Sequence, residues 1–251
     1  RAAVAANAFV LGSDIDASSA SSWNSNAGFT PIGNNTTSFS GKFNGLGHTI
    51  TGLTQSAATT DYLGLFGKST GSIANVILSG SSITGRSYVG ALAGYGASFY
   101  NIRILGGSVT GSAYVGGMAG YAASTVNTVN TSAAVNGVDA ATTPARFIGG
   151  MLGAGAGAVN NTISTGNLTV TNTTASLATG SNALSSTSLG TLHSLGGLIG
   201  QLAPSADMTL ANNISTGNVT VTTTASTCGV NYCISNVGGL IGTLGGSLRS
   251  E

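Results

Sequence analysis

A short apolar and glycine-rich segment recurs along this chain and sets its hydrophobic pattern. Residues 88–94 read YVGALAG, and residues 114–120 read YVGGMAG, so one heptapeptide is present in two nearly identical copies. In both copies the second and fifth positions are apolar, whereas the third and seventh are glycine. A shorter copy covers residues 62–67, at the same spacing before the first full copy, and later copies begin at Phe147, Ser194 and Asn236. A fixed period of this length is typical of solenoid folds, in which each repeat forms one coil.

Alignment of the copies gives columns of chemically similar residues. If each unit is one coil, equivalent positions stack about 4.8 Å apart, so like side chains touch along one axis. Apolar columns then form interior files, and asparagine columns form ladders of bonded amides. The fifth position of the segment is Leu92, Met118, Met151, Leu198 and Leu240. Thirteen residues after each of the first four starts stand Asn75, Asn101, Asn127 and Asn160, and eight residues further on stand Ile83, Val109, Val135 and Leu168.

These columns predict an all-β fold, specifically a parallel β-helix of about six coils. A coil of the length from Tyr88 to Tyr114 accommodates two or three short strands joined by glycine-rich corners. A helical repeat is disfavoured, because each glycine in a helix interior costs about 1 kcal/mol. A β-sandwich or another all-β fold is the remaining alternative.

The spacing between copies widens after residue 136. The copies that begin at 114, 147, 194 and 236 are farther apart than the earlier ones, and the additional residues fall at about 137–146, 172–193 and 223–235. Because the coils stack in register, these loops are expected to emerge at one edge of the solenoid. That edge is a candidate binding surface; the alternatives are unselected drift of loop length or a cover over the wall.

The chain divides into N-terminal opening coils at residues 1–61 and the repeat solenoid at residues 62–251, which together form one continuous body. A new unit starts at Asn236 and stops at Glu251, so we expect a piece of a longer polypeptide. The alanine-rich start at residues 1–10 is either a remnant near a secretory cleavage site or simply the first strand.

Charge is unusually sparse. Only 5% of the residues are charged, compared with about 25% in an average protein, and the formal net charge is +1. No basic stripe is present, so nucleic acid is not an expected partner. A membrane-spanning helix needs roughly 20 consecutive apolar residues, and no apolar run approaches that length, so none is expected. The surface must therefore consist mainly of hydroxyl and amide groups.

The only cysteines are Cys228 and Cys233, which lie five positions apart in a polar segment. They are candidates for a small disulfide ring if the protein enters an oxidising compartment. A zinc site requires three or four ligands, and neither histidine is near them in the sequence. We therefore predict no metal site.

Few residues could support catalysis. Glycosidase chemistry needs paired carboxylates, and the only close pair is Asp14 and Asp16, for which a role in a turn or cap is favoured. His48 is expected to pack or hydrogen-bond at a corner, and His193 to be solvated. We predict no catalytic residue and no cofactor. Threonine pairs in NLTVT and NVTVT leave a lattice-matching surface for ice or carbohydrate as a further alternative.

Several segments resemble one known family. Trp23, residues 29–33 (FTPIG), residues 39–45 (FSGKFNG) and residues 47–50 (GHTI) resemble the opening coils of bacterial surface proteins that bear the GLUG motif. The later GLFG, GGLIG and NISTGNVT segments are similar to the repeats of the same proteins. These proteins include filamentous-haemagglutinin-like adhesins, and the resemblance implies a right-handed coil and an extracellular location.

The resulting expectation is a structural or adhesive solenoid, secreted or displayed on a bacterial cell surface, that is not an enzyme. Its expected partners are a host or neighbouring-cell surface, a glycan or matrix component, or other copies of itself. A self-assembling filament or biofilm-matrix subunit is the second hypothesis. A carbohydrate-active β-helix enzyme is a third and weaker one.

Overall fold

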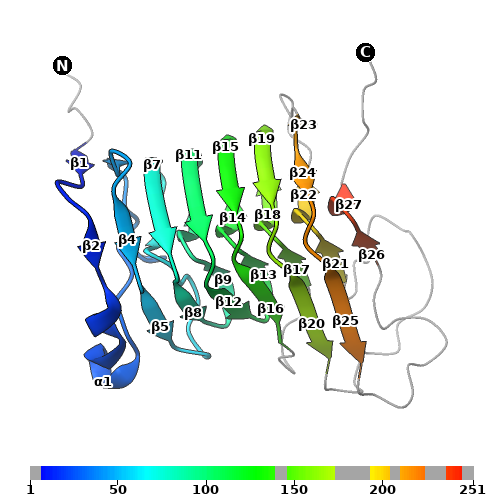
Figure 1. Ribbon diagram of the computed structural model, residues 1–251, viewed down its shortest axis with the longest axis horizontal. Helices are drawn as coiled ribbons and strands as arrows, with labels where there is room; N and C mark the ends of the chain where they lie inside the picture. Colours follow the sequence, from blue (N-terminus) through cyan, green and yellow to red (C-terminus); the bar gives the residue numbers. More distant parts are fainter. Residues whose placement is uncertain (1–6, 139–145, 173–192, 204–209, 224–235, 245–251) are drawn as a thin grey trace.

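The protein is a parallel β-solenoid, as the repeat pattern predicts. The computed structural model describes residues 7–138, 146–172, 193–203, 210–223 and 236–244. Every pairing between named strands is parallel, and like strands of successive coils lie side by side along the long axis (Figure 1). Two of the four sheets contain six strands each, one from each stacked level of the described chain.

Each regular coil has four strands rather than the two or three expected. The heptapeptide supplies two of them, because the chain bends sharply in its middle. Strands β9 (Ser87–Gly90) and β10 (Ala93–Gly96) come from the first full copy, followed by β11 (Ser98–Leu105) and β12 (Ser108–Gly111). The next coil repeats this order from β13 (Ala113–Gly116).

The remaining elements belong to the same four sheets. The largest sheet contains β1 (Ala8–Val10), β2 (Ile15–Asp16), β3 (Lys42–Asn44), β4 (Thr49–Thr51), β7 (Ser72–Ser79), β11, β15 (Val126–Thr131), β19 (Val159–Ser164), β23 (Leu210–Ala211) and β24 (Ile214–Ser215). The second contains β6 (Phe66–Lys68), β10, β14 (Ala119–Ala122), β18 (Leu152–Ala156), β22 (Ile199–Ala203) and β27 (Ile241–Leu244). The third contains β5 (Thr54–Ser56), β8 (Ser82–Thr84), β12, β16 (Ala134–Gly137), β20 (Leu168–Asn172) and β25 (Val219–Thr223). The fourth contains β9, β13, β17 (Arg146–Gly149), β21 (His193–Gly196) and β26 (Asn236–Gly238).

Apolar files fill the interior. Leu92, Met118 and Met151 are fully buried, and their backbones bond in succession, with Leu92 N donating to Met118 O and Met118 N to Met151 O, both at 2.9 Å. Leu198 continues this file, whereas Leu240, at the last described level, is 38% exposed. A second file in the third sheet holds Ile83, Val109, Val135 and Leu168 in register. Apolar side chains at equivalent positions of successive coils therefore bury one another, and no second layer of secondary structure is needed to cover the core.

The N-terminal level is less regular. A short 3-10 helix at Ser18–Ser22 and the single-turn α1 (Trp23–Asn26) follow β2. Gln55 occupies the first position of the Ile83 file, and it is buried. Its amide donates to the carbonyl oxygens of Phe29 (3.0 Å) and Gly64 (2.8 Å) and accepts from the Gly64 N–H (2.9 Å). These three bonds offset the cost of burying an amide.

The interior also holds hydroxyl groups opposite glycines. Ile104 stacks on Thr131, which stacks on Ser164, which stacks on Ser215. At the three hydroxyl levels the fourth heptapeptide residue is glycine. A Cβ added to Gly117 would lie 2.9 Å from Thr131 Oγ1, and one added to Gly150 would lie 2.5 Å from Ser164 Oγ. At the level of Ile104 the fourth heptapeptide residue is Ala91.

Candidate functional site

One position of each coil has left-handed backbone angles, and the asparagine column lies at this position in only some of the coils. Asn75 and Asn101 both have left-handed backbone angles, with φ of 55° and 52°, and Asn101 Nδ2 donates to Asn75 Oδ1 at 2.8 Å. At the next two levels the left-handed residues are Thr128 (φ 56°) and Asn161 (φ 55°). Asn127 and Asn160 lie one position earlier, in the column of Tyr100.

A single additional residue explains the shift. Tyr95 pairs with Tyr121 between β10 and β14, but Tyr100 pairs with Asn127 between β11 and β15, so the offset between coils is one residue larger in the second pairing. Between β12 and β16 the smaller offset returns. The corner before β15 is thus one residue longer, and the corner after it is one residue shorter.

The shifted asparagines still form hydrogen bonds between coils. Asn127 contributes to the amide ladder, because Asn161 Nδ2 donates to its Oδ1 at 3.1 Å. Asn160 Oδ1 accepts from the backbone N–H of Ala211 at 3.0 Å. Of the four predicted asparagines, Asn75 and Asn101 thus bond to each other, whereas Asn127 bonds to Asn161 and Asn160 bonds to the backbone of Ala211.

A tyrosine face lies at the corner between the second and fourth sheets, and we define it as Tyr62, Tyr88, Tyr114, Tyr95 and Tyr121. Tyr62 and Tyr88 stack with ring centroids 4.7 Å apart and planes 3° from parallel. Tyr88 and Tyr114 stack at 4.4 Å and 5°. All five tyrosines are partly buried and partly exposed to solvent. The result is a row of phenol groups at the spacing of the coils.

A second, shorter row completes this face. Tyr95 and Tyr121 stack at 5.1 Å and 7°, and Tyr121 also meets Tyr114 edge-on at 6.3 Å. The ammonium of Lys68 lies 5.3 Å from the centre of the Tyr95 ring and 5.9 Å from that of Tyr62, which are cation–π distances. The tyrosine face is therefore aromatic, rich in hydroxyl groups and carries one positive charge.

Burial disfavours ionisation of three of these phenols, those of Tyr62, Tyr88 and Tyr121. Burial raises the pKa of Tyr88 above its ordinary value, and the neighbouring phenols of Tyr114 and Tyr62 raise it further. The pKa values of Tyr62 and Tyr121 are also raised, in both cases chiefly by burial. Tyr62, Tyr88 and Tyr121 therefore present hydroxyl donors rather than phenolate anions at neutral pH.

Sequence reasoning did not assign a role to these tyrosines, although a signal was present. Tyrosine opens the copies at positions 62, 88 and 114, and another tyrosine follows the last glycine of two copies, at 95 and 121. The turn geometry that brings the rows together depends on the seventh-position glycine. A Cβ added to Gly120 would lie 2.5 Å from the carbonyl oxygen of Tyr114, so only glycine allows this close approach.

An ion pair borders the tyrosine face. Arg86 Nε donates to Asp61 Oδ1 at 2.7 Å, and Arg86 Nη2 donates to Asp61 Oδ2 at 2.6 Å. This two-pronged contact joins one coil to the next and raises the pKa of Arg86. Both side chains are partly exposed, so the pair contributes little stability by itself. Its effect is to fix the corner from which Tyr62 and Tyr88 project.

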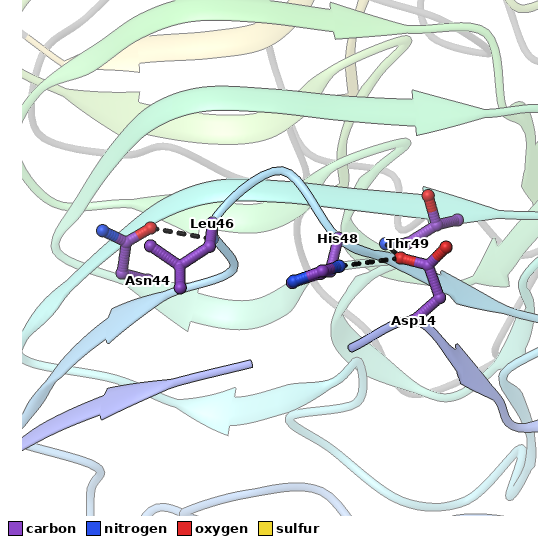
Figure 2. Close-up of polar contacts among 5 residues, drawn as sticks. All are labelled: Asp14, Asn44, Leu46, His48 and Thr49. Atoms are coloured by element: carbon purple, nitrogen blue, oxygen red, sulfur yellow. Dashed lines mark hydrogen bonds and ion pairs between the residues drawn. The ribbon is translucent and has the colours of Figure 1, made fainter. Parts of the chain in front are cut away.

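Asp14 and His48 meet at the N-terminal level (Figure 2). Asp14 Oδ1 lies 3.0 Å from His48 Nδ1 and accepts the backbone N–H of Thr49 at 2.9 Å. These contacts hold the pKa of Asp14 below its ordinary value, the Thr49 N–H being the larger cause. The Asp14 side chain is 73% exposed, so the contact tethers the segment before β2 to the next coil in open solvent.

Asp16 is placed in a turn. Its Oδ1 accepts the backbone N–H of Ser18 at 2.9 Å, at the start of the 3-10 helix. Hydrogen bonding from the Ser18 hydroxyl, and then from this N–H, lowers the pKa of Asp16. His193 begins β21, where its backbone pairs with Arg146. The described residues contain no group of three or more His, Cys, Asp or Glu placed to hold a metal ion.

Several predicted features fall outside the described residues. These are the disulfide candidates Cys228 and Cys233 and most of the three late loops. In the part of the chain that is described, no helix has the length and apolar character needed to cross a membrane.

Comparison with known proteins gives one partial similarity. Over 86 residues the chain is 43% identical to a protein named halomucin, from Haloquadratum walsbyi. The alignment covers 32% of this chain and 1% of halomucin, so the chain corresponds to a very small part of that protein's length. No protein-family model matches the chain, and no solved structure matches it significantly.

We expect Thr128→Asn to stabilise the protein. A β-branched residue in the left-handed region is strained, whereas asparagine adopts that region readily. The free energy of unfolding, measured by chemical denaturation, should rise by about 1 kcal/mol. Asn101→Thr, the reverse change one level away, should lower it by a similar amount or more. A loss of stability in Thr128→Asn would contradict the explanation that the left-handed backbone angles favour asparagine at this position.

Acid should loosen the N-terminal level through Asp14. The pKa of Asp14 in the folded protein lies below its ordinary value, so its contacts stabilise the fold above the pKa of the unfolded chain and are lost as the pH falls through the lower pKa of the folded protein. Hydrogen exchange measured by NMR should show the protection factor of the Thr49 amide falling over this range. In Asp14→Asn the neutral amide oxygen still accepts, so this pH dependence should disappear. The same acid dependence in both proteins would contradict the assignment.

Proposed function

We propose that this chain is an extracellular structural and adhesive β-solenoid of a secreted or surface-displayed protein, and that it contacts its partner through the tyrosine face. The observation that carries the proposal is the regular stack of partly exposed tyrosines, which forms an extended surface of one chemistry on a wall with few charges. Enzyme activity is not part of this proposal.

The chemistry of the wall supports an extracellular structural role. Each coil contacts only its neighbours, so the solenoid can be extended by adding coils without redesign of the core. A surface of hydroxyls and amides with 5% charged residues suits a scaffold that faces other polar surfaces. The partial similarity to the protein named halomucin also supports an extracellular location.

The tyrosine face supports an adhesive role toward polysaccharide. Tyrosine combines a rigid apolar body with a polar end, which is why it is enriched at binding surfaces. Sugars present apolar C–H faces together with many hydroxyls, so ring edges and phenol hydroxyls can bind both. Lys68 adds one donor at the edge of the face. A glycan or matrix component therefore fits this surface better than nucleic acid does.

Binding of the purified chain to immobilised cellulose, chitin and alginate tests the proposal. We expect retention on at least one of these polysaccharides. The double variant Tyr95→Thr/Tyr121→Thr, which keeps residues suited to a strand, should bind about tenfold more weakly or worse. Tyr100→Thr is the matched control, because Tyr100 is exposed at 41% on another sheet and should not affect binding. Equal losses in both variants, or no binding by the unmodified chain, would argue against the proposal.

A self-assembling filament subunit is the second candidate, and one observation favours it. The N-terminal level exposes large apolar side chains, namely Phe9 (48%), Val10 (62%), Ile15 (42%), Trp23 (51%) and Leu46 (58%). Strand β1 lies at the end of the strand order of its sheet, next to β3 alone. An unpaired strand edge beside apolar groups is a template for pairing with another chain.

If this surface mediates assembly, the protein should form end-to-end fibres visible by negative-stain electron microscopy. The variant Val10→Lys/Trp23→Ser adds a charge to the edge and removes the largest ring, so it should remain a short rod. Tyr100→Thr, on the exposed side wall in the middle of the solenoid, is the control substitution. Fibres formed equally by the Val10→Lys/Trp23→Ser variant would eliminate this surface as the contact.

A further inference from the structure

We propose that the stacked tyrosines are a modification site, at which a one-electron oxidant joins neighbouring coils by dityrosine cross-links. The geometry points to Tyr88 and Tyr114 as the principal pair, because their ring centroids are 4.4 Å apart and their planes differ by 5°. Tyr62 with Tyr88, at 4.7 Å, and Tyr95 with Tyr121, at 5.1 Å, are the next pairs. This inference goes beyond the adhesive role and does not depend on it.

The fold places these rings close together without distorting them. Tyr88 and Tyr114 belong to successive coils and are far apart in the sequence, but their strands pair in parallel with Val115 opposite Val89. Left-handed backbone angles at Tyr62, Tyr88 and Tyr114 project all three side chains from the same corner. Because the parallel ladder fixes this register, each ring stays beside its neighbour as long as the protein is folded.

The tyrosine side chains are fixed at their bases and partly exposed to solvent. Each residue is only partly buried, so part of it is in contact with solvent. Each side chain is anchored at its base by a buried neighbour, such as Val89 beside Tyr88. A carbon–carbon bond between two parallel rings requires the rings to tilt toward each other. A ring that is fixed only at its Cβ end can make this movement.

The reaction balances with hydrogen peroxide, used through a haem peroxidase, as oxidant. Each phenol loses one electron and one proton, giving two phenoxyl radicals. The radicals form one carbon–carbon bond between ring carbons adjacent to the hydroxyls. Each bonded carbon then gives up its hydrogen, and each oxygen regains one, so both phenols are restored. The two electrons and two protons reduce the peroxide to two molecules of water.

The neighbouring phenol of Tyr114 supplies the second radical beside the first. The pKa of Tyr88 is raised by burial, so the group is oxidised as a neutral phenol that releases its proton with the electron. The Tyr114 ring lies next to it, with ring centroids 4.4 Å apart, so the two radicals form side by side. A lone exposed tyrosine such as Tyr100 lacks an adjacent phenol partner of this kind in the described chain.

Treatment of the purified, folded chain with a haem peroxidase and hydrogen peroxide tests the proposal. Blue dityrosine fluorescence should appear while the protein remains monomeric on a denaturing gel. After trypsin digestion, mass spectrometry should find peptide 87–103 joined to peptide 104–146, with the loss of two hydrogen atoms. Fragmentation of this product should place the bond at Tyr88 and Tyr114.

Two double variants separate stacking from simple exposure. Tyr88→Phe/Tyr121→Phe keeps the ring stacks but leaves no stacked pair of tyrosines among the described residues, so the joined peptides should disappear. Tyr100→Phe/Tyr232→Phe removes the same number of phenols elsewhere and should leave the yield unchanged. Tyr232 lies outside the described residues and serves only to balance the number of tyrosines.

Unfolding in urea is the second control. Oriented neighbours react at far higher effective concentration than groups on a flexible chain, so the yield of the joined peptides should fall at least about tenfold. The proposal is overturned if the folded chain yields no joined peptides or forms cross-links only between molecules. It is equally overturned if the yield is the same in urea, or if the joined peptides persist in Tyr88→Phe/Tyr121→Phe.

Discussion

The parallel backbone ladder between successive coils is the interaction on which the rest of this structure depends. It holds all four sides of successive coils in parallel register, with a one-residue change of offset at β15, and the interior files follow from it. Because each coil binds only the coils before and after it, stability accumulates from neighbour to neighbour. The core needs no facing layer, since Leu92, Met118 and Met151 bury one another along the axis.

The same ladder organises the outside of the solenoid. Any residue type that recurs at one position of the repeat becomes a continuous row, with members separated by the distance between coils. The tyrosine face is the clearest example, because its rings stack at 4.4 and 4.7 Å in one row. A wall with few charges thus carries an aromatic surface that no single coil could provide.

The architecture was predictable from the sequence, because the apolar columns are spaced evenly enough to imply stacking. The asparagine column was predictable only in part. A longer corner before β15 and a shorter one after it leave the total length of the coil unchanged, so counting from the heptapeptide cannot detect that Thr128 replaces Asn127 in the column.

The four-sided coil was not predicted, because the chain bends inside an apolar heptapeptide and no polar residue marks the bend. The contact between Asp14 and His48 also could not be inferred, because no repeat aligns these two residues of the irregular opening coils. The stacked tyrosines, by contrast, were visible as a pattern, but their significance depends on ring geometry, which the sequence does not contain.

The pairing of interior hydroxyls with glycines limits how this solenoid can be rearranged. Thr131 faces Gly117 and Ser164 faces Gly150, whereas the level that holds Ile104 carries Ala91 instead. The carbonyl oxygen of the equivalent glycine in the next coil lies still closer to such a Cβ, at 2.3 Å for Gly117 and 2.2 Å for Gly150. These glycines are therefore required both by the hydroxyl of their own coil and by the backbone of the next one. Duplication of whole coils preserves both neighbours, but recombination inside a coil separates a glycine from its hydroxyl.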